Sequence, residues 1–96
     1  MEVIALKSFH KSLKSCPKYI QEAVRVILNE KLPAAKSLQE SGLDYTKMEG
    51  TQKGEKYYRI RVGNYRIGIE NINPNIIVIV IMKRNDMYKF FPPKQN

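Results

Sequence analysis

The first third of the chain combines two hydrophobic periods. Residues 1–6 alternate weakly between two sides, which predicts a short strand. From Ser8 the apolar positions recur every three to four residues, which predicts two helices. The second helix should run from Pro17 to Leu32, because a proline suits the first turn of a helix, with Ser15 or Cys16 as its cap. The apolar stripe of this helix consists of Ile20, Ala23, Val24, Ile27 and Leu28.

Proline and glycine divide the middle of the chain. Pro33 should end the second helix, since the residue before a proline disfavours helical geometry. Residues 34–40 allow one further helical turn, which Gly42 would end. Residues 47–56 are polar and contain glycine, which is typical of a loop.

The second half has the pattern of strands. Tyr57 to Val62 and Tyr65 to Glu70 alternate strictly, and they flank Gly63-Asn64, which has the length and composition of a type II′ hairpin turn. Residues 71–75 predict a second turn. Ile76 to Met82 is continuously apolar and mostly β-branched, as expected of a central strand covered on both faces.

These elements predict an α+β fold in a single domain covering residues 1–96. An N-terminal strand and a helical hairpin precede a three-stranded antiparallel meander, and the strands form one sheet with the helices packed on one face. A short helical turn over residues 87–91 should follow the last strand. A chain of 96 residues is too short for a large Rossmann domain or a TIM barrel.

The two-residue turn determines which side chains share a face of the hairpin. Pairing Val62 with Tyr65 places Arg61 opposite Arg66 and Arg59 opposite Gly68. One face is then apolar and should belong to the core: Tyr58, Ile60, Val62, Tyr65, Ile67 and Ile69. The other face is basic: Tyr57, Arg59, Arg61, Arg66, Gly68 and Glu70.

Like charges directly opposite each other destabilise a sheet, so Arg61 facing Arg66 favours an anion between them. Phosphate suits the guanidinium fork. Gly68 beside Arg59 leaves an open spot that a backbone or a ligand can approach closely. In the alternative interpretation, the arginines lie along bulk water and their stems cover apolar neighbours.

The net charge supports a polyanionic partner. The chain has 17 basic and 9 acidic residues, a net charge of +8. Residues 47–96 carry ten basic and four acidic residues, so most of the excess lies in the second half. Such a field attracts nucleic acid or an acidic protein, although solubility alone is an alternative explanation.

Other sequence features exclude several classes of function. Cys16 is the only cysteine, so no internal disulfide forms and a reducing cytoplasm is expected. The longest apolar run, residues 76–82, is too short to cross a bilayer, and no secretory signal is evident. His10 should be a surface residue and Cys16 a buried structural thiol. There is no metal-ligand cluster and no Gly-rich phosphate loop, so neither a metal nor a cofactor is expected.

Two segments carry a resemblance to a known family. Residues 57–67, YYRIRVGNYRI, are followed by an apolar strand and then by residues 83–88, KRNDMY. This pattern resembles the RelE/ParE superfamily of bacterial toxins, and its RelE branch most closely. The preceding strand, helical hairpin and loop match in order, so the resemblance covers nearly the whole chain.

The resemblance implies an endoribonuclease that cuts messenger RNA, most often in the ribosomal A site, and that an antitoxin neutralises. Carried over by position, the catalytic residues are Arg59, Arg61, Arg66, Arg84 and Tyr88. The best-known RelE has a lysine pair where Arg59 and Arg61 stand. An arginine with a pKa above about 12 does not serve readily as a general base, so this role passes to Tyr88, with Glu70 as a second candidate.

Cleavage without a metal needs a base for the 2′-hydroxyl, positive charge around the phosphate and a proton for the leaving 5′-oxygen. Four lysines should contact RNA or the ribosome: Lys53, Lys56, Lys83 and Lys89. The expected partners are an acidic cognate antitoxin, messenger RNA and ribosomal RNA, with no membrane. Two alternatives remain open, namely a non-enzymatic ParE-like toxin that binds DNA gyrase and an inactive relic that binds only antitoxin.

Overall fold

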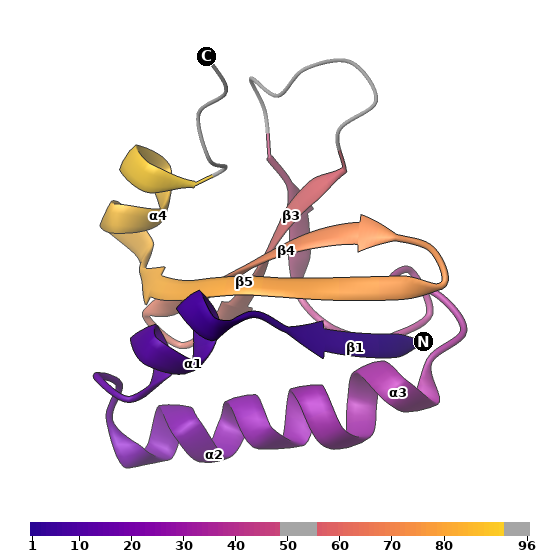
Figure 1. Ribbon diagram of the computed structural model, residues 1–96, viewed down its shortest axis with the longest axis horizontal. Helices are drawn as coiled ribbons and strands as arrows, with labels where there is room; N and C mark the ends of the chain where they lie inside the picture. Colours follow the sequence, from indigo (N-terminus) through magenta and orange to yellow (C-terminus); the bar gives the residue numbers. More distant parts are fainter. Residues whose placement is uncertain (49–55, 92–96) are drawn as a thin grey trace.

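The second half of the chain forms an antiparallel meander (Figure 1). Its strands are β3 (Tyr57–Val62), β4 (Tyr65–Ile72) and β5 (Asn75–Lys83). The structure is a computed structural model and describes residues 1–48 and 56–91. Gly63 has a φ of 58° and no other described residue of the turn has a positive φ, as a type II′ turn requires. The predicted register is confirmed, with Val62 opposite Tyr65 and Arg61 opposite Arg66.

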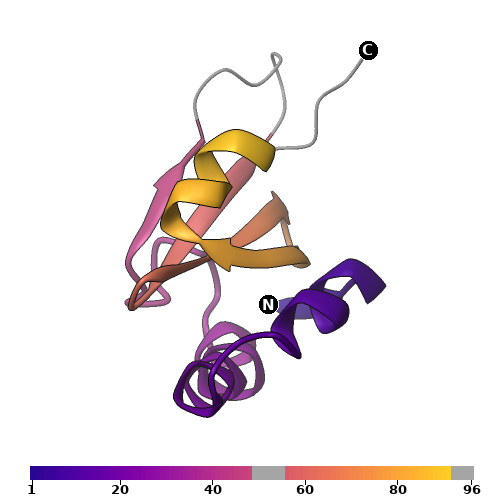
Figure 2. The same ribbon diagram turned by 90° about the vertical axis from the view of Figure 1, so that its left-hand side faces the viewer.

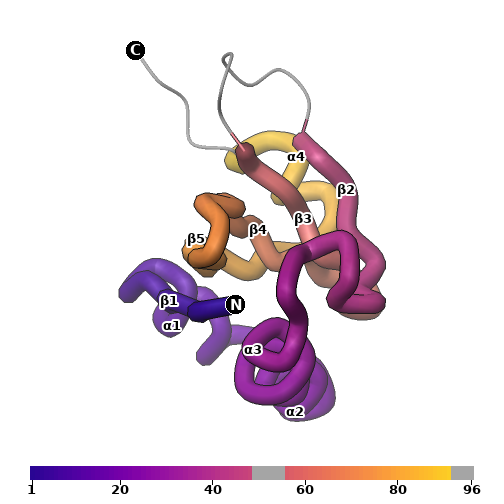
Figure 3. The backbone as a smooth tube through the Cα atoms, turned by 90° about the vertical axis from the view of Figure 1, so that its right-hand side faces the viewer, coloured from indigo at the N-terminus to yellow at the C-terminus, as the bar shows by residue number. Residues whose placement is uncertain are grey.

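Two further strands extend the meander to a five-stranded sheet. β1 (Glu2–Ala5) runs parallel to β5, and β2 (Tyr45–Lys47) runs antiparallel to β3. The order is β1-β5-β4-β3-β2, which can be followed across Figure 3. The sequence did not predict β2, and the loop prediction is wrong at Lys47. A three-residue edge strand with two exposed side chains has no hydrophobic period to indicate it.

The predicted helical hairpin is confirmed, with different ends. α1 (Lys7–Leu13) is followed by α2 (Lys18–Val26), which continues through a π-helical segment, η1 (Ile27–Lys31), into α3 (Leu32–Ala34). The predicted cap at Ser15 or Cys16 is wrong, because Pro17 itself occupies the position before the first helical residue.

Pro33 also lies inside α3 instead of ending the helix before it. Directly before it, the N–H of Leu32 donates to the carbonyl of Ile27, five residues back. In a regular α-helix a proline clashes with the carbonyl four residues earlier. The wider turn changes the hydrogen-bonding register at this point of the helix.

The further helical turn predicted over residues 34–40 does not form. Ala35 is extended (φ −84°, ψ 146°), and bends and turns follow it. Leu38 is completely buried in the core, so this segment is held by one apolar anchor and not by a helical stripe. The remainder of the predicted loop, residues 49–55, lies outside the described residues.

The main core lies between one face of the sheet and the helices α1 and α2. It contains Phe9 of α1 and Val24 of α2 together with the predicted apolar face of the hairpin, of which Ile60, Ile67 and Ile69 are completely buried. The corresponding stripe prediction for the second helix is confirmed at its buried positions Ile20, Val24 and Ile27.

A last helix, α4 (Arg84–Phe90), packs on the opposite face of the sheet (Figure 2). Met87 of this helix and Phe91 after it form a second, smaller core with Met48. The prediction of helices on one face therefore holds for α1 and α2 but not for α4. The predicted turn over residues 87–91 is a longer helix that begins directly after β5.

The strand β5 connects the beginning and the end of the described chain. It lies between β1 and β4, and it also contacts α1. The Ser8 hydroxyl donates to the carbonyl of Ile79 at 2.6 Å, and the N–H of Ile81 donates to the Ser12 hydroxyl at 3.0 Å. None of the described helices is long and apolar enough to cross a membrane.

Candidate functional site

Basic side chains of the sheet and of α4 surround a pocket of about 190 Å³ on the face opposite the main core. The pocket brings together all five residues predicted as catalytic. Two further residues of its wall were not predicted. The lining residues are Asp44, Thr46, Arg59, Arg61, Arg66, Arg84 and Tyr88. We call this site the arginine pocket.

Local structure explains why these side chains converge. Arg59 and Arg61 are two residues apart on β3 and therefore point to the same face. Arg66 lies opposite Arg61 on β4. Arg84 and Tyr88 are four residues apart on α4 and thus share one side of that helix. The hairpin register and one helical turn are sufficient to build the site.

Arg66 is held by the hairpin turn. Its Nη1 donates to the carbonyl of Gly63 at 2.9 Å and to the carbonyl of Tyr65 at 2.8 Å. Desolvation by burial lowers the pKa of Arg66, and the positive charges of Arg61, Arg84 and Arg59 lower it further. The repulsion among these guanidiniums is relieved by any anion that enters the pocket.

Arg61 turns toward Asp44, which directly precedes β2. The backbone N–H of Arg61 donates to the carbonyl of Asp44 at 2.8 Å, and the guanidinium Nη1 lies 3.9 Å from the Asp44 carboxylate. Both side chains are more than half exposed, so this ion pair contributes little to stability. The carboxylate supplies a weakly held counter-charge at the entrance of an otherwise cationic pocket.

Tyr88 is an exposed member of the site, with 55% of its surface exposed. The guanidinium carbon of Arg59 lies 4.7 Å from the centre of its ring, in cation–π geometry. Hydrogen bonding to Arg84, and then the charge of Arg59, lower the pKa of the Tyr88 hydroxyl below its ordinary value of about 10. The pocket therefore favours the phenolate, which is the form that accepts a proton.

The position of Tyr88 depends on how α4 docks. The ring of Phe91 lies on Gly68, so closely that a Cβ added there would be 2.8 Å from the ring. The Tyr57 ring meets Phe91 edge to face at 5.5 Å between centroids. The open spot predicted at Gly68 is therefore filled by an aromatic ring of the chain itself, because α4 folds back over the sheet.

Glu70, the second candidate base, does not line the arginine pocket. It lies opposite Tyr57 on the hairpin, beyond the position that Phe91 covers. Among the described residues the ion pairs join Arg25 to Glu22 and Glu30, and Arg61 to Asp44, so Arg59 and Glu70 form none. Of the two candidate bases, Tyr88 alone is among the described residues that line the arginine pocket.

Three of the four lysines predicted to contact RNA can be placed. Lys56, Lys83 and Lys89 are all exposed, at the start of β3, at the end of β5 and on α4. Lys53 lies outside the described residues. Lys83 directly precedes Arg84 and Lys89 directly follows Tyr88, so both lysines are neighbours in sequence of residues that line the arginine pocket.

The two residues set aside during sequence analysis lie away from the pocket. His10 is exposed on α1, and its ring meets that of Phe9 edge to face. Cys16 is buried, and burial raises the pKa of its thiol. In the part of the chain that the structure describes, no group of His, Cys, Asp or Glu side chains could hold a metal ion.

Asp44 and Thr46 were missed because Thr46 belongs to the short strand that the pattern did not reveal and Asp44 directly precedes it. Thr46 pairs with Arg59 in the sheet, so the strand places it directly beside the predicted arginines. Once β2 is known, alternation explains both residues, because an edge strand beside β3 must contribute alternate side chains to the basic face. The strand itself could be located only from its pairing with β3.

The arrangement suits an extended phosphate with developing negative charge. Four guanidiniums surround the pocket, and guanidinium forks bind phosphate oxygens in bidentate fashion. A phenol with a lowered pKa lies at the rim of the same pocket. Chemistry at a phosphate in which the protein supplies no nucleophile requires positive charge around the phosphate and a proton acceptor in the same site.

Comparison with known proteins agrees with the fold and the sequence pattern. No family model matches the chain. A curated relative, Toxin RelE3 of Methanocaldococcus jannaschii, is 40% identical over 92 residues, which is 96% of this chain and the whole of that protein. The chain therefore belongs to the RelE family of toxins.

Solved structures show the same fold. The RelB–RelE antitoxin–toxin complex from Methanococcus jannaschii contains a chain with 38% identity and a TM-score of 0.73, covering 93% of this chain and 99% of that chain. The archaeal RelE–RelB complex from Pyrococcus horikoshii OT3 gives 27% identity and a TM-score of 0.55, covering 86% and 93%. The match extends over nearly the whole length of each neighbour.

Proposed function

We propose that this RelE-family toxin is an endoribonuclease that cleaves messenger RNA on the ribosome without a metal ion. The observation that supports this most strongly is the arginine pocket, where four guanidiniums and a tyrosine of lowered pKa line one cavity of about 190 Å³. A surface that only bound a protein partner would have no need of a proton acceptor among its cations.

In the proposed reaction the 2′-oxygen of the RNA attacks the adjacent phosphorus. The Tyr88 phenolate takes the proton of the 2′-hydroxyl as the bond from the 2′-oxygen to phosphorus forms. The bond from phosphorus to the 5′-oxygen breaks, and that oxygen is protonated from solvent. The products are a 2′,3′-cyclic phosphate and a 5′-hydroxyl.

The arginines stabilise the charge that develops in this reaction. Arg59, Arg61 and Arg66 come from adjacent strands and surround the phosphate oxygens, where negative charge grows in the transition state. Arg84 bonds to Tyr88, so it also keeps the phenolate oriented. Among the described residues no lysine lines the arginine pocket, which favours Tyr88 over a lysine of lowered pKa as the base.

Mapping of messenger RNA ends after induction in a bacterium tests this function. We expect new 5′ ends within translated codons soon after wild-type induction, and none with Tyr88→Ala expressed to the same level. Intact message together with DNA damage would contradict the proposal and indicate a gyrase-binding toxin. Intact message without growth arrest would indicate an inactive relic.

We also propose that a small acidic antitoxin neutralises the protein. Two of the neighbouring structures are described as complexes of RelE with RelB. The net charge of +8 favours an acidic partner, and a partner lying over the arginine pocket would replace the phosphate with carboxylates. A protein encoded next to this chain should co-purify with it in high salt, and calorimetry that detected no binding would contradict this proposal.

A further inference from the structure

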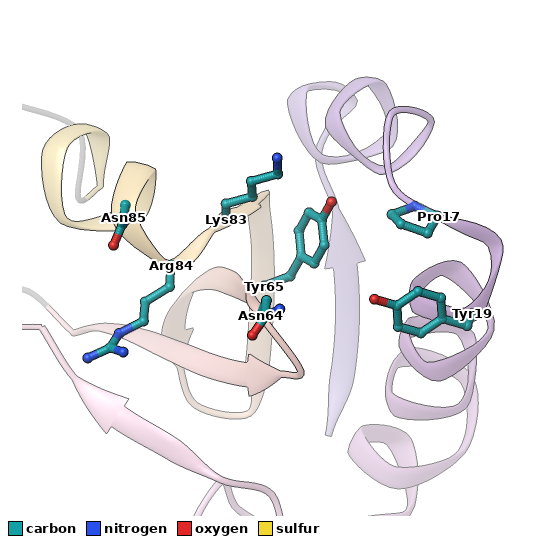
Figure 4. Close-up of a pocket in the computed structure, with 7 residues that line it drawn as sticks. All are labelled: Pro17, Tyr19, Asn64, Tyr65, Lys83, Arg84 and Asn85. Atoms are coloured by element: carbon teal, nitrogen blue, oxygen red, sulfur yellow. The ribbon is translucent and has the colours of Figure 1, made fainter.

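A second pocket, of about 470 Å³, adjoins the arginine pocket and shares Arg84 with it. Its walls come from the start of α2, the β3–β4 turn and the junction of β5 with α4. Figure 4 shows the seven lining residues, which are Pro17, Tyr19, Asn64, Tyr65, Lys83, Arg84 and Asn85. We call this site the tyrosine pocket.

Backbone pairing holds two of these walls together. The N–H of Arg84 donates to the carbonyl of Asn64 at 3.0 Å, which joins the start of α4 to the hairpin turn. Tyr65 lies directly opposite Lys83 in the β4–β5 ladder. The relative placement of Tyr65, Lys83 and Arg84 is therefore fixed by backbone pairing, and Tyr19 faces them from α2.

The pocket combines aromatic, cationic and amide side chains. In Figure 4 the rings of Tyr19 and Tyr65 stand on its two sides, with Lys83 and Arg84 on the side of Tyr65 away from Tyr19. Tyr19 is 67% exposed. An aromatic ring with so much exposed surface is unusual unless it contacts a binding partner. Among the described residues no carboxylate lines the pocket, so its charged side chains attract an anionic group.

These groups match the parts of a nucleotide. Tyrosine rings stack on nucleobases of any sequence, and lysine and arginine bind phosphate. The amides of Asn64 and Asn85 can both donate to and accept from a base edge. An acidic peptide would use the two cations but would leave the two rings without a flat partner.

We infer that the tyrosine pocket binds the nucleotide next to the cleaved linkage, with its base on Tyr19 and Tyr65 and its phosphate on Lys83 and Arg84. The inference rests on the proposed function, since it assigns the adjacent phosphate to the arginine pocket. Arg84 lines both pockets, so it bridges consecutive phosphates of one strand. We therefore assign this nucleotide to the cleaved strand and not to ribosomal RNA.

The test uses a short labelled RNA with a 2′-deoxy sugar at the scissile position, which binds but does not react. Fluorescence anisotropy should show that Tyr19→Ala weakens binding roughly 5- to 100-fold, the range expected for loss of one stacked base. Tyr19→Phe keeps the ring and should retain most of the affinity. Ile72→Ala, a matched loss of an exposed apolar side chain at the far end of β4, should bind like the wild type.

A second arm removes the ligand instead of the ring. An RNA shortened by the nucleotide that enters the tyrosine pocket should bind the wild type at least as weakly as the full RNA binds Tyr19→Ala, because its phosphate contacts are lost as well. Shortening should weaken binding by that variant less than it weakens binding by the wild type, since the stacking on Tyr19 is already absent. Shortening from each end in turn reveals on which side of the cleaved linkage the nucleotide lies.

Several results would overturn the inference. One is equal binding of the RNA by Tyr19→Ala and the wild type, and another is no measurable RNA binding by the wild type. If Tyr19→Ala weakened binding of ribosomes only, the pocket would be assigned to ribosomal RNA. If it weakened binding of the acidic partner only, the pocket would be assigned to that partner. Failure of the proposed function is distinguishable, because message would then remain uncut even when Tyr19→Ala weakens RNA binding. Conversely, cut message with unchanged RNA binding by Tyr19→Ala would reject the tyrosine pocket alone.

Discussion

The two faces of the β3–β4 hairpin are built from alternate residues of the same strands, yet they are surrounded very differently. On one face Ile60, Ile67 and Ile69 are completely buried under α1 and α2. On the other face Arg59, Arg61 and Arg66 line an open pocket, and α4 covers only part of this face. One strand pair therefore serves packing and chemistry at the same time.

The difference separates the origin of stability from the origin of activity. Burial of the isoleucines favours the folded state, whereas crowding of the guanidiniums opposes it. Substitutions on the apolar face should therefore change the free energy of unfolding, and substitutions on the basic face should change cleavage. The predictions below test this separation, beginning with the largest expected effect.

Tyr88→Phe should reduce single-turnover cleavage on programmed ribosomes by about 10²–10⁴-fold, the usual worth of general base catalysis. The ring stays, so its contact with Arg59 and the melting temperature should be nearly unchanged. Tyr88→Ala serves as the control for the ring and should be no more than slightly slower than Tyr88→Phe. If Tyr88→Phe cleaves normally while Tyr88→Ala fails, the residue stacks on the RNA and is not the base.

Ile60→Ala tests the apolar face. Removing a completely buried isoleucine side chain should lower the free energy of unfolding by about 2–5 kcal/mol. Denaturant titration measures this change, and cleavage assayed well below the melting temperature should stay close to that of the wild type. A large loss of activity in the folded variant would show that the two faces are coupled.

Gly68→Ala lies on the basic face but should behave as a packing change. The added methyl group would lie within 3.0 Å of three atoms of the Phe91 ring, so α4 must shift. We expect a loss of about 1–3 kcal/mol in the free energy of unfolding, with reduced cleavage because Tyr88 moves with the helix. Phe91→Leu combined with Gly68→Ala should recover part of both, and failure of this recovery would point to a different cause.

The pH dependence of cleavage should reflect the lowered pKa of Tyr88. The phenolate is the active form, so the rate should rise with pH and level off above that pKa, which is below about 10. Arg84→Gln removes the main cause of the lowering, so the rise should move to higher pH as well as start from a lower rate. A pH profile that keeps its position in Arg84→Gln would exclude Tyr88 as the titrating group.

Arg61→Gln should have the smallest effect on stability. It relieves the repulsion with Arg66 and loses only an exposed ion pair with Asp44, so the melting temperature should stay unchanged or rise slightly. Toxicity should nevertheless be lost. Arg25→Gln, which loses exposed ion pairs on α2, is the matched control and should keep toxicity. A clear drop in melting temperature for Arg61→Gln alone would make this arginine structural.

The hairpin with its three arginines, and Arg84 and Tyr88 after the last strand, could be predicted because their positions depend on local rules. A two-residue glycine turn and strict alternation determine the register, and the register determines the faces. Arg84 and Tyr88 needed only one helical turn after an apolar strand. The family resemblance then gave each of these residues a role.

The remaining features depend on contacts between distant segments. β2 exists because β3 offers it an edge, and nothing in the sequence around Tyr45 shows that pairing. The side of the sheet that α4 covers depends on Phe91, whose ring packs against the backbone of Gly68, where no side chain is in the way. The tyrosine pocket likewise joins Tyr19 to residues more than forty positions further along the chain. The hydrophobic pattern and the spacing of residues along the chain carry no information about such tertiary contacts.

The position of β5 also has a consequence for the timing of synthesis. Among the described strands β1 pairs with β5 alone, and Ser8 and Ser12 bond to residues made about seventy codons later. The strand β1 therefore waits for a partner that is synthesised about seventy codons later. Arg84 and Tyr88 are added directly after β5, so the fold closes and the site is completed almost together. A growing chain therefore lacks both its completed sheet and its arginine pocket until α4 has been translated.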